Sequence, residues 1–215
     1  MEKNSFKYPV EARDKSKLTD FYLKNKKIIY LSIISLIIIL ISTSFYLNHK
    51  EKKIASLSSN YVRAKIILKN GDKDTAKNIL NEIVLSNNPT YSALSFFLML
   101  NENLIEDKNK ISTLFDHLLK NNKYEKEIKD LIIFKKFLFQ SNFIDESELL
   151  EGLKPLINTN SIWKPHALLL IADYFFSKKE YLKAQDFYFQ VVSVKNLEKG
   201  MYDYARSQIS LSNNE

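Results

Sequence analysis

The 215-residue chain contains no cysteine, only three glycines and four prolines. Without cysteine there are no disulfide cross-links, thiolate nucleophiles or cysteine-ligated metals. No glycine-rich phosphate loop, GxSxG, HExxH or calcium-binding loop occurs. The three histidines stand in unrelated sequence contexts, at His49, His117 and His166. The sequence therefore predicts a protein that is not an enzyme, with no catalytic residue, cofactor-binding residue or metal ligand.

Charge is missing from one long run, residues 28–47, which reads IIYLSIISLIIILISTSFYL. A helix rises about 1.5 Å per residue, so these twenty residues cover about 30 Å, the thickness of the hydrocarbon core of a bilayer. No glycine or proline interrupts the run, and Tyr30, Phe45 and Tyr46 lie near its ends, where aromatic rings favour the membrane interface. We interpret it as a transmembrane helix.

A cleavable signal peptide is the alternative, because Ser42-Thr43-Ser44 offers small residues at its end. The long region before the run favours an uncleaved anchor, since signal peptides have a short basic start and an apolar core of about 7–15 residues. Within about 20 residues of the span, six basic residues precede it and five follow it, which leaves orientation open by charge alone. Long domains translocate largely regardless of charge, which favours a cytoplasmic N-terminus.

This interpretation divides the chain into a basic cytoplasmic tail (1–27), the span (28–47) and a helical domain (48–215) that lies outside the cytoplasm. The tail carries eight basic and four acidic residues, and such a segment beside a span is attracted to anionic lipid headgroups. In the helical domain the charges alternate in sign and no nucleic-acid-binding motif occurs, so no nucleic acid is expected as a partner.

Apolar residues after the span recur at helical spacing rather than at alternate positions, as in Ala76, Ile79, Leu80 and Ile83. Polar or Pro-containing breaks separate the predicted helices, at Asn70-Gly71-Asp72, Asn87-Asn88-Pro89 and Asn158-Thr159-Asn160. The predicted fold class is all-α, an N-terminal transmembrane helix followed by antiparallel helix pairs.

Residues 165–195 fit the tetratricopeptide pattern, with small residues Ala172 and Ala184 at the predicted close crossing of two helices. A weaker match over residues 57–89 repeats the twelve-residue spacing with Ala64 and Ala76. Residues 90–121 and 124–158 have the length of two further pairs, and residues 200–211 could cover the last pair. The prediction is a tetratricopeptide-like α-solenoid, with a generic helical bundle as the alternative.

This layout resembles the ancillary subunit of the Sec translocon, a bacterial family with a short N-terminus, one uncleaved span and a periplasmic tetratricopeptide-like domain. Its landmarks here are Tyr91-Ser92-Ala93-Leu94, Trp163 and Ser177-Lys178-Lys179. The resemblance implies a single-pass protein of the inner membrane with its C-terminal domain in the periplasm. It also implies three kinds of protein partner: translocon subunits, a periplasmic chaperone or prolyl isomerase, and exported chains.

A repeat domain of this kind binds proteins on the inner surface formed by its first helices. In the two clearest repeats those positions predict a protein-binding groove with an apolar, aromatic character. The predicted groove residues are Tyr61, Lys65, Leu68, Leu169, Asp173 and Phe176. The alternative is that these side chains are buried against neighbouring helices because the repeats are irregular.

The span offers a second predicted contact face, because Ser32, Ser35 and Ser42 lie within about 80° of one another on a helical wheel. Small hydroxyl residues allow close helix approach and hydrogen bonding between helices. Alternatively, each serine bonds a carbonyl of its own helix one turn back.

Together these features predict a non-enzymatic, membrane-anchored protein-interaction module that assists exported proteins at the Sec translocon. A scaffold for envelope assembly or cell division would need the same anchor and repeats, and the sequence does not separate the two.

Overall fold

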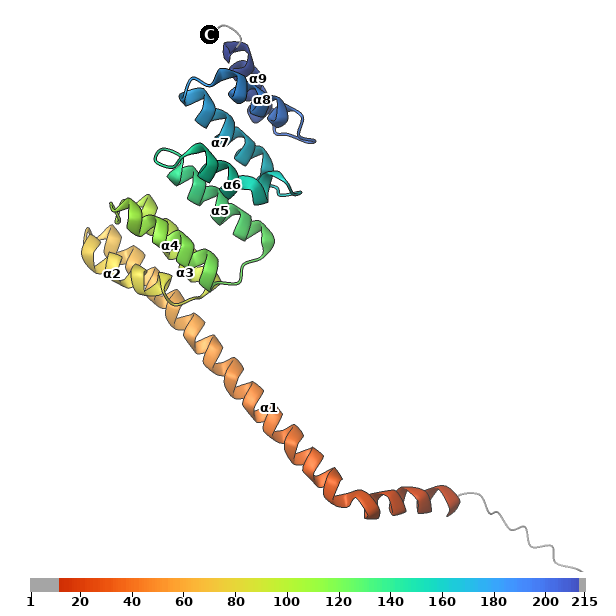
Figure 1. Ribbon diagram of the computed structural model, residues 1–215. Coiled ribbons are helices and arrows are strands. Elements are labelled where there is room, and N and C mark those ends of the chain that lie inside the picture. The colour runs from red at the N-terminus through yellow and green to blue at the C-terminus, as the bar shows by residue number, and fades with distance from the viewer. Residues whose placement is uncertain (1–11, 213–215) are drawn as a thin grey trace, which may run out of the picture. The chain divides into compact units, whose positions relative to one another are not determined.

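The structure is a computed structural model that describes the backbone of residues 12–212 and the side chains of residues 21–212 (Figure 1). Over the described backbone the chain forms nine helices and no strand, which confirms the all-helical prediction. The helices are α1 (Ala12–Lys69), α2 (Lys73–Val84), α3 (Pro89–Asn101), α4 (Lys108–Asn121), α5 (Lys126–Gln140), α6 (Glu146–Ile157), α7 (Lys164–Ser177), α8 (Tyr181–Val192) and α9 (Lys199–Ser212).

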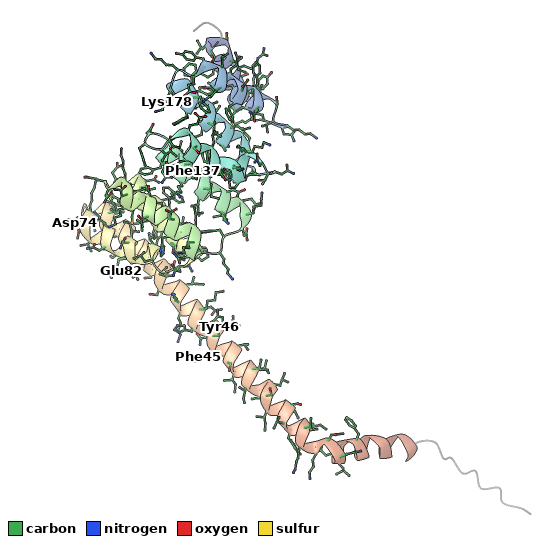
Figure 2. All side chains as sticks on the ribbon, viewed as in Figure 1. Phe45, Tyr46, Asp74, Glu82, Phe137 and Lys178 are labelled. Carbon is green, nitrogen blue, oxygen red and sulfur yellow. The ribbon has the colours of Figure 1, made fainter. Side chains whose placement is uncertain are left out.

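Helix α1 contains the apolar run, and the part of the helix that includes this run is long and apolar enough to cross a membrane. Almost every side chain from residue 28 to residue 47 is exposed, and Figure 2 shows Phe45 and Tyr46 projecting from the helix. The helix continues without a break past residue 48, the predicted start of the helical domain. The compact helical unit begins within α1, at Leu57.

Side-chain caps determine where several of the following helices begin. The Asp72, Asn88, Asp107 and Asp145 carboxylate or amide oxygens accept hydrogen bonds from backbone N–H groups in the first turns of α2, α3, α4 and α6. Such caps satisfy donors that have no partner within the helix. Gly71, between α1 and α2, has a φ of 89°, a conformation that favours glycine. The predicted breaks therefore lie between helices for local chemical reasons.

Helices that follow one another in the chain pack side by side from α2 to α9. Their buried side chains form two apolar clusters. The first joins the end of α1 with α2, α3 and α4, and includes an edge-on contact between Phe96 and Phe115 with ring centroids 4.7 Å apart. The second joins α5 to α9 around Leu153, Phe175 and Tyr188. The four alanines of the predicted close crossings are fully buried, at Ala64, Ala76, Ala172 and Ala184.

Helix α5 contributes to both clusters from adjacent turns. Ile132 belongs to the first cluster, whereas Phe134 belongs to the second. From the start of α7, Trp163 stacks on the Phe134 ring at 6.0 Å, and its indole Nε1–H donates to the Glu127 carbonyl at 3.0 Å. These contacts connect α7 with the first turn of α5.

The α5–α6 contact depends on a glycine. A Cβ atom built on Gly152 would overlap the ring of Phe137, which Figure 2 labels on α5. Glycine within a helix costs roughly 0.5–1 kcal/mol relative to alanine. Close packing of the Phe137 ring is the compensating interaction, because the ring occupies the space that a side chain at position 152 would need.

We predict that Gly152→Ala lowers the free energy of unfolding by about 1–2 kcal/mol, because overpacking outweighs the gain in helix propensity. Urea unfolding of the detergent-solubilised chain can be followed by the fluorescence of Trp163, the single tryptophan. The matched control is Gly200→Ala in α9, where the added Cβ meets nothing closer than a side-chain oxygen at 3.9 Å. Equal stability of the two variants would contradict the assigned role of Gly152.

Candidate protein-binding groove

On α1, the predicted groove residues Tyr61, Lys65 and Leu68 lie close to the first cluster. Tyr61 and Leu68 are partly buried against it, and the Tyr61 ring lies 6.1 Å from that of Tyr91 on α3. The exposed Lys65 places its ammonium 6.0 Å from the Tyr61 ring centroid. Tyr61 and Leu68 thus serve mainly in packing, and Lys65 faces solvent.

On α7, Leu169, Asp173 and Phe176 lie against the second cluster rather than the first. Leu169 and Phe176 are partly buried there, and Phe176 makes an edge-on contact with Tyr181 at 5.4 Å. The apolar predicted residues of the two repeats therefore pack against different clusters.

Asp173 connects the last three helices. Its Oδ1 accepts hydrogen bonds from the hydroxyls of Tyr188 on α8, at 2.6 Å, and Tyr204 on α9, at 3.2 Å. Burial raises the pKa of the Asp173 carboxyl above its ordinary value of 3.8, although the two hydroxyls act in the opposite direction. Burial and the same carboxylate raise the pKa of both tyrosines. Asp173 is thus a structural acceptor.

An apolar groove lies between α3 and α5, and it was not among the predicted sites. Its volume is about 440 Å³. Leu94 on α3 and Ile128 on α5 line it while remaining 44% and 45% exposed. Its other lining residues come from the same two helices and the loop before α5: Pro89, Thr90, Ala93, Phe97, Lys123, Tyr124, Glu125, Leu131 and Ile132.

Few polar groups line this groove. Helix α3 contains no charged residue, and the charged lining residues, Lys123 and Glu125, both come from the loop. The Tyr124 hydroxyl is buried without a hydrogen-bond partner, and burial raises the pKa of Tyr124 to about 12. A buried hydroxyl without a partner costs about 1–3 kcal/mol. The groove thus offers mainly apolar contact area.

The sequence carried little signal for this groove. Leu94 and Ile128 belong to residues 90–121 and 124–158, and the degenerate repeat pattern of these two segments fixes no register from which outward positions can be assigned. The contribution of Tyr124 depends on the loop conformation, which no periodic pattern encodes.

The predicted contact face of the span remains exposed. Ser32, Ser35 and Ser42 are exposed side chains on α1. Nearby, the Thr43 hydroxyl donates to the Ile39 carbonyl at 2.9 Å, the one-turn-back bond that formed the alternative for the serines.

The chain matches no protein-family model, no curated protein and no solved structure. Among the side chains from residue 21 to residue 212, no group of three or more histidine, aspartate or glutamate residues is arranged to hold a metal ion.

We predict that the contribution of Asp173 to the free energy of unfolding decreases as pH rises. A carboxyl with a higher pKa in the folded than in the unfolded chain binds more protons when folded, so stability decreases as pH rises from about 3.8 through the raised pKa. In urea titrations from pH 3.5 to pH 7, the unfolding free energy of the native chain minus that of Asp173→Asn should fall with pH. A difference that rises with pH would contradict the burial of this carboxyl.

We predict that Tyr124→Phe leaves the unfolding free energy unchanged or raises it by about 1 kcal/mol, because it removes an unsatisfied buried hydroxyl. Tyr188→Phe is the control, since its hydroxyl donates to Asp173 and its loss should be destabilising. Urea unfolding of both variants measures the contrast. A Tyr124→Phe variant as destabilised as Tyr188→Phe would show that the Tyr124 hydroxyl has a partner.

Proposed function

We propose that this chain is a non-enzymatic, single-pass membrane protein whose helical unit binds apolar segments of other polypeptides in the α3–α5 groove. The groove itself carries the proposal: large apolar side chains, Leu94 and Ile128, remain nearly half exposed beside a hollow of about 440 Å³. Exposed apolar surface gathered around a concavity is typical of binding sites, and this volume lies within the range of ligand pockets.

We also propose a tetratricopeptide-like arrangement, in which this groove lies on the inner surface of the solenoid. We pair the end of α1 with α2, α3 with α4, α5 with α6 and α7 with α8, and assign α9 as the terminal cover. In that arrangement α3 and α5 are the first helices of neighbouring repeats, and first helices form the inner, ligand-binding surface of such solenoids.

An apolar chain segment is the best-fitting ligand, because each apolar Å² removed from water contributes about 25 cal/mol and no charge on α3 has to be desolvated. Unfolded polypeptides expose apolar segments with free backbone groups.

The cellular setting follows from the span and from the resemblance in layout. We propose an inner-membrane protein with residues 1–27 in the cytoplasm and its helical unit in the periplasm. Its partners would be Sec translocon subunits, a periplasmic chaperone or prolyl isomerase, and the exported chains. The basic segment beside the span would contact anionic lipid headgroups.

Site-specific photo-crosslinking in cells tests this function. A photoreactive residue replaces Leu94 in the groove or, as control, Leu182 on α8, which is 82% exposed and does not line the groove. We predict that position 94 crosslinks to translocon subunits and exported chains several-fold more than position 182. Crosslinks from position 94 to division or envelope-assembly proteins alone would favour the scaffold function. Equal, unspecific labelling from both positions would reject the groove.

A further inference from the structure

A second hollow, of about 640 Å³, lies between the loop that precedes α7 and the C-terminal end of α8. Its polar lining consists of two lysines and four neutral hydrogen-bonding residues: Lys164, Lys195, Asn160, Ser161, Gln190 and Ser193. No acidic residue lines it. Among the described side chains, neither lysine has a carboxylate at ion-pair distance, so both ammonium groups are available to an anionic partner.

Apolar side chains border the same hollow. Ile162, in the loop, is 65% exposed, and Phe189, on α8, is 49% exposed. Phe189 also lines a neighbouring hollow of about 510 Å³, together with Tyr202 and Arg206 of α9. The Arg206 guanidinium lies 5.8 Å from the Tyr202 ring centroid. Phe189 therefore borders both a hollow lined by Lys164 and Lys195 and a hollow lined by Arg206.

The positive charge of Lys164 and Lys195 is complementary to carboxylates, and Phe189 and Ile162 offer apolar contact. We therefore propose that the surface around Phe189 binds an acidic polypeptide segment that also carries apolar side chains. Carboxylates of the segment pair with Lys164 and Lys195, while a leucine or aromatic side chain packs on Phe189 and Ile162. The neutral amides of Asn160 and Gln190 supply hydrogen bonds to its backbone.

A polypeptide fits this surface better than a lipid headgroup does. A headgroup would pair with the two lysines and leave Ile162 and Phe189 exposed to water. A peptide contacts both lysines and also covers these two apolar side chains. The surface is also distinct from the α3–α5 groove in position and in chemistry, since the groove selects apolar segments and this surface selects acidic ones. The two proposals can therefore fail separately.

The test uses the full chain in nanodiscs of neutral lipid and a fluorescent fifteen-residue peptide that alternates Asp or Glu with Leu or Phe. A peptide with Gln in place of every acidic residue is the ligand control. We expect the acidic peptide to bind and the Gln peptide to bind at least tenfold more weakly in fluorescence anisotropy. Added salt should weaken binding of the acidic peptide, because salt screens exposed charge pairs.

Charge reversal locates the site. Lys164→Glu combined with Lys195→Glu should weaken binding of the acidic peptide about tenfold. The matched control is Lys69→Glu combined with Lys110→Glu, which changes the net charge equally at exposed positions on other helices. Phe189→Ser should also weaken binding, whereas Leu182→Ser, at an exposed position of α8 that lines neither hollow, should leave it unchanged.

Three outcomes would overturn the proposal. One is equal loss of affinity in the two double variants, which would indicate attraction by net charge alone. The second is absence of binding by the acidic peptide. In the third, the chain in nanodiscs binds vesicles of anionic phosphatidylglycerol but does not bind the peptide, and the Lys164→Glu and Lys195→Glu substitutions abolish the binding to vesicles.

Discussion

The helical unit depends on α5, because this helix packs into both apolar clusters. Ile132 and Phe134 lie two residues apart, and they belong to different clusters. Trp163 then stacks on Phe134 and donates to the Glu127 carbonyl in the first turn of α5. Helices of twelve to fifteen residues are marginal in isolation. Burial on both sides of α5 therefore stabilises the helices that precede it and those that follow it.

The same helix forms one wall of the apolar groove. Because Ile132 faces the first cluster, Ile128, one turn earlier, lies at the edge of the hollow opposite Leu94 of α3. Packing of the core thus leaves part of the apolar surface of α3 and α5 uncovered. The protein-binding function that we propose uses surface that core packing does not bury, and it needs no catalytic residue.

Local chemistry explains why the helices were predictable and the sites were only partly so. Apolar spacing and the capping residues Asn88 and Asp145 act within a few positions of the chain, so the sequence displays them directly. Tyr61 and Leu169 are partly buried against helices distant in sequence, which is the alternative that the sequence left open for the groove residues. Asp173 was predicted to line a groove, and in the structure its carboxylate accepts hydrogen bonds from Tyr188 on α8 and Tyr204 on α9.

Hydrogen–deuterium exchange of the full chain in nanodiscs, with and without a saturating apolar peptide, tests the central claim most directly. The account predicts slower exchange in α3 and from the loop at Lys123 through the first turns of α5, because those segments line the groove. Exchange in α8 and α9 should not change. Protection confined to α8 and α9, or no protection by a peptide that demonstrably binds, would contradict the assignment of the α3–α5 groove as the binding site.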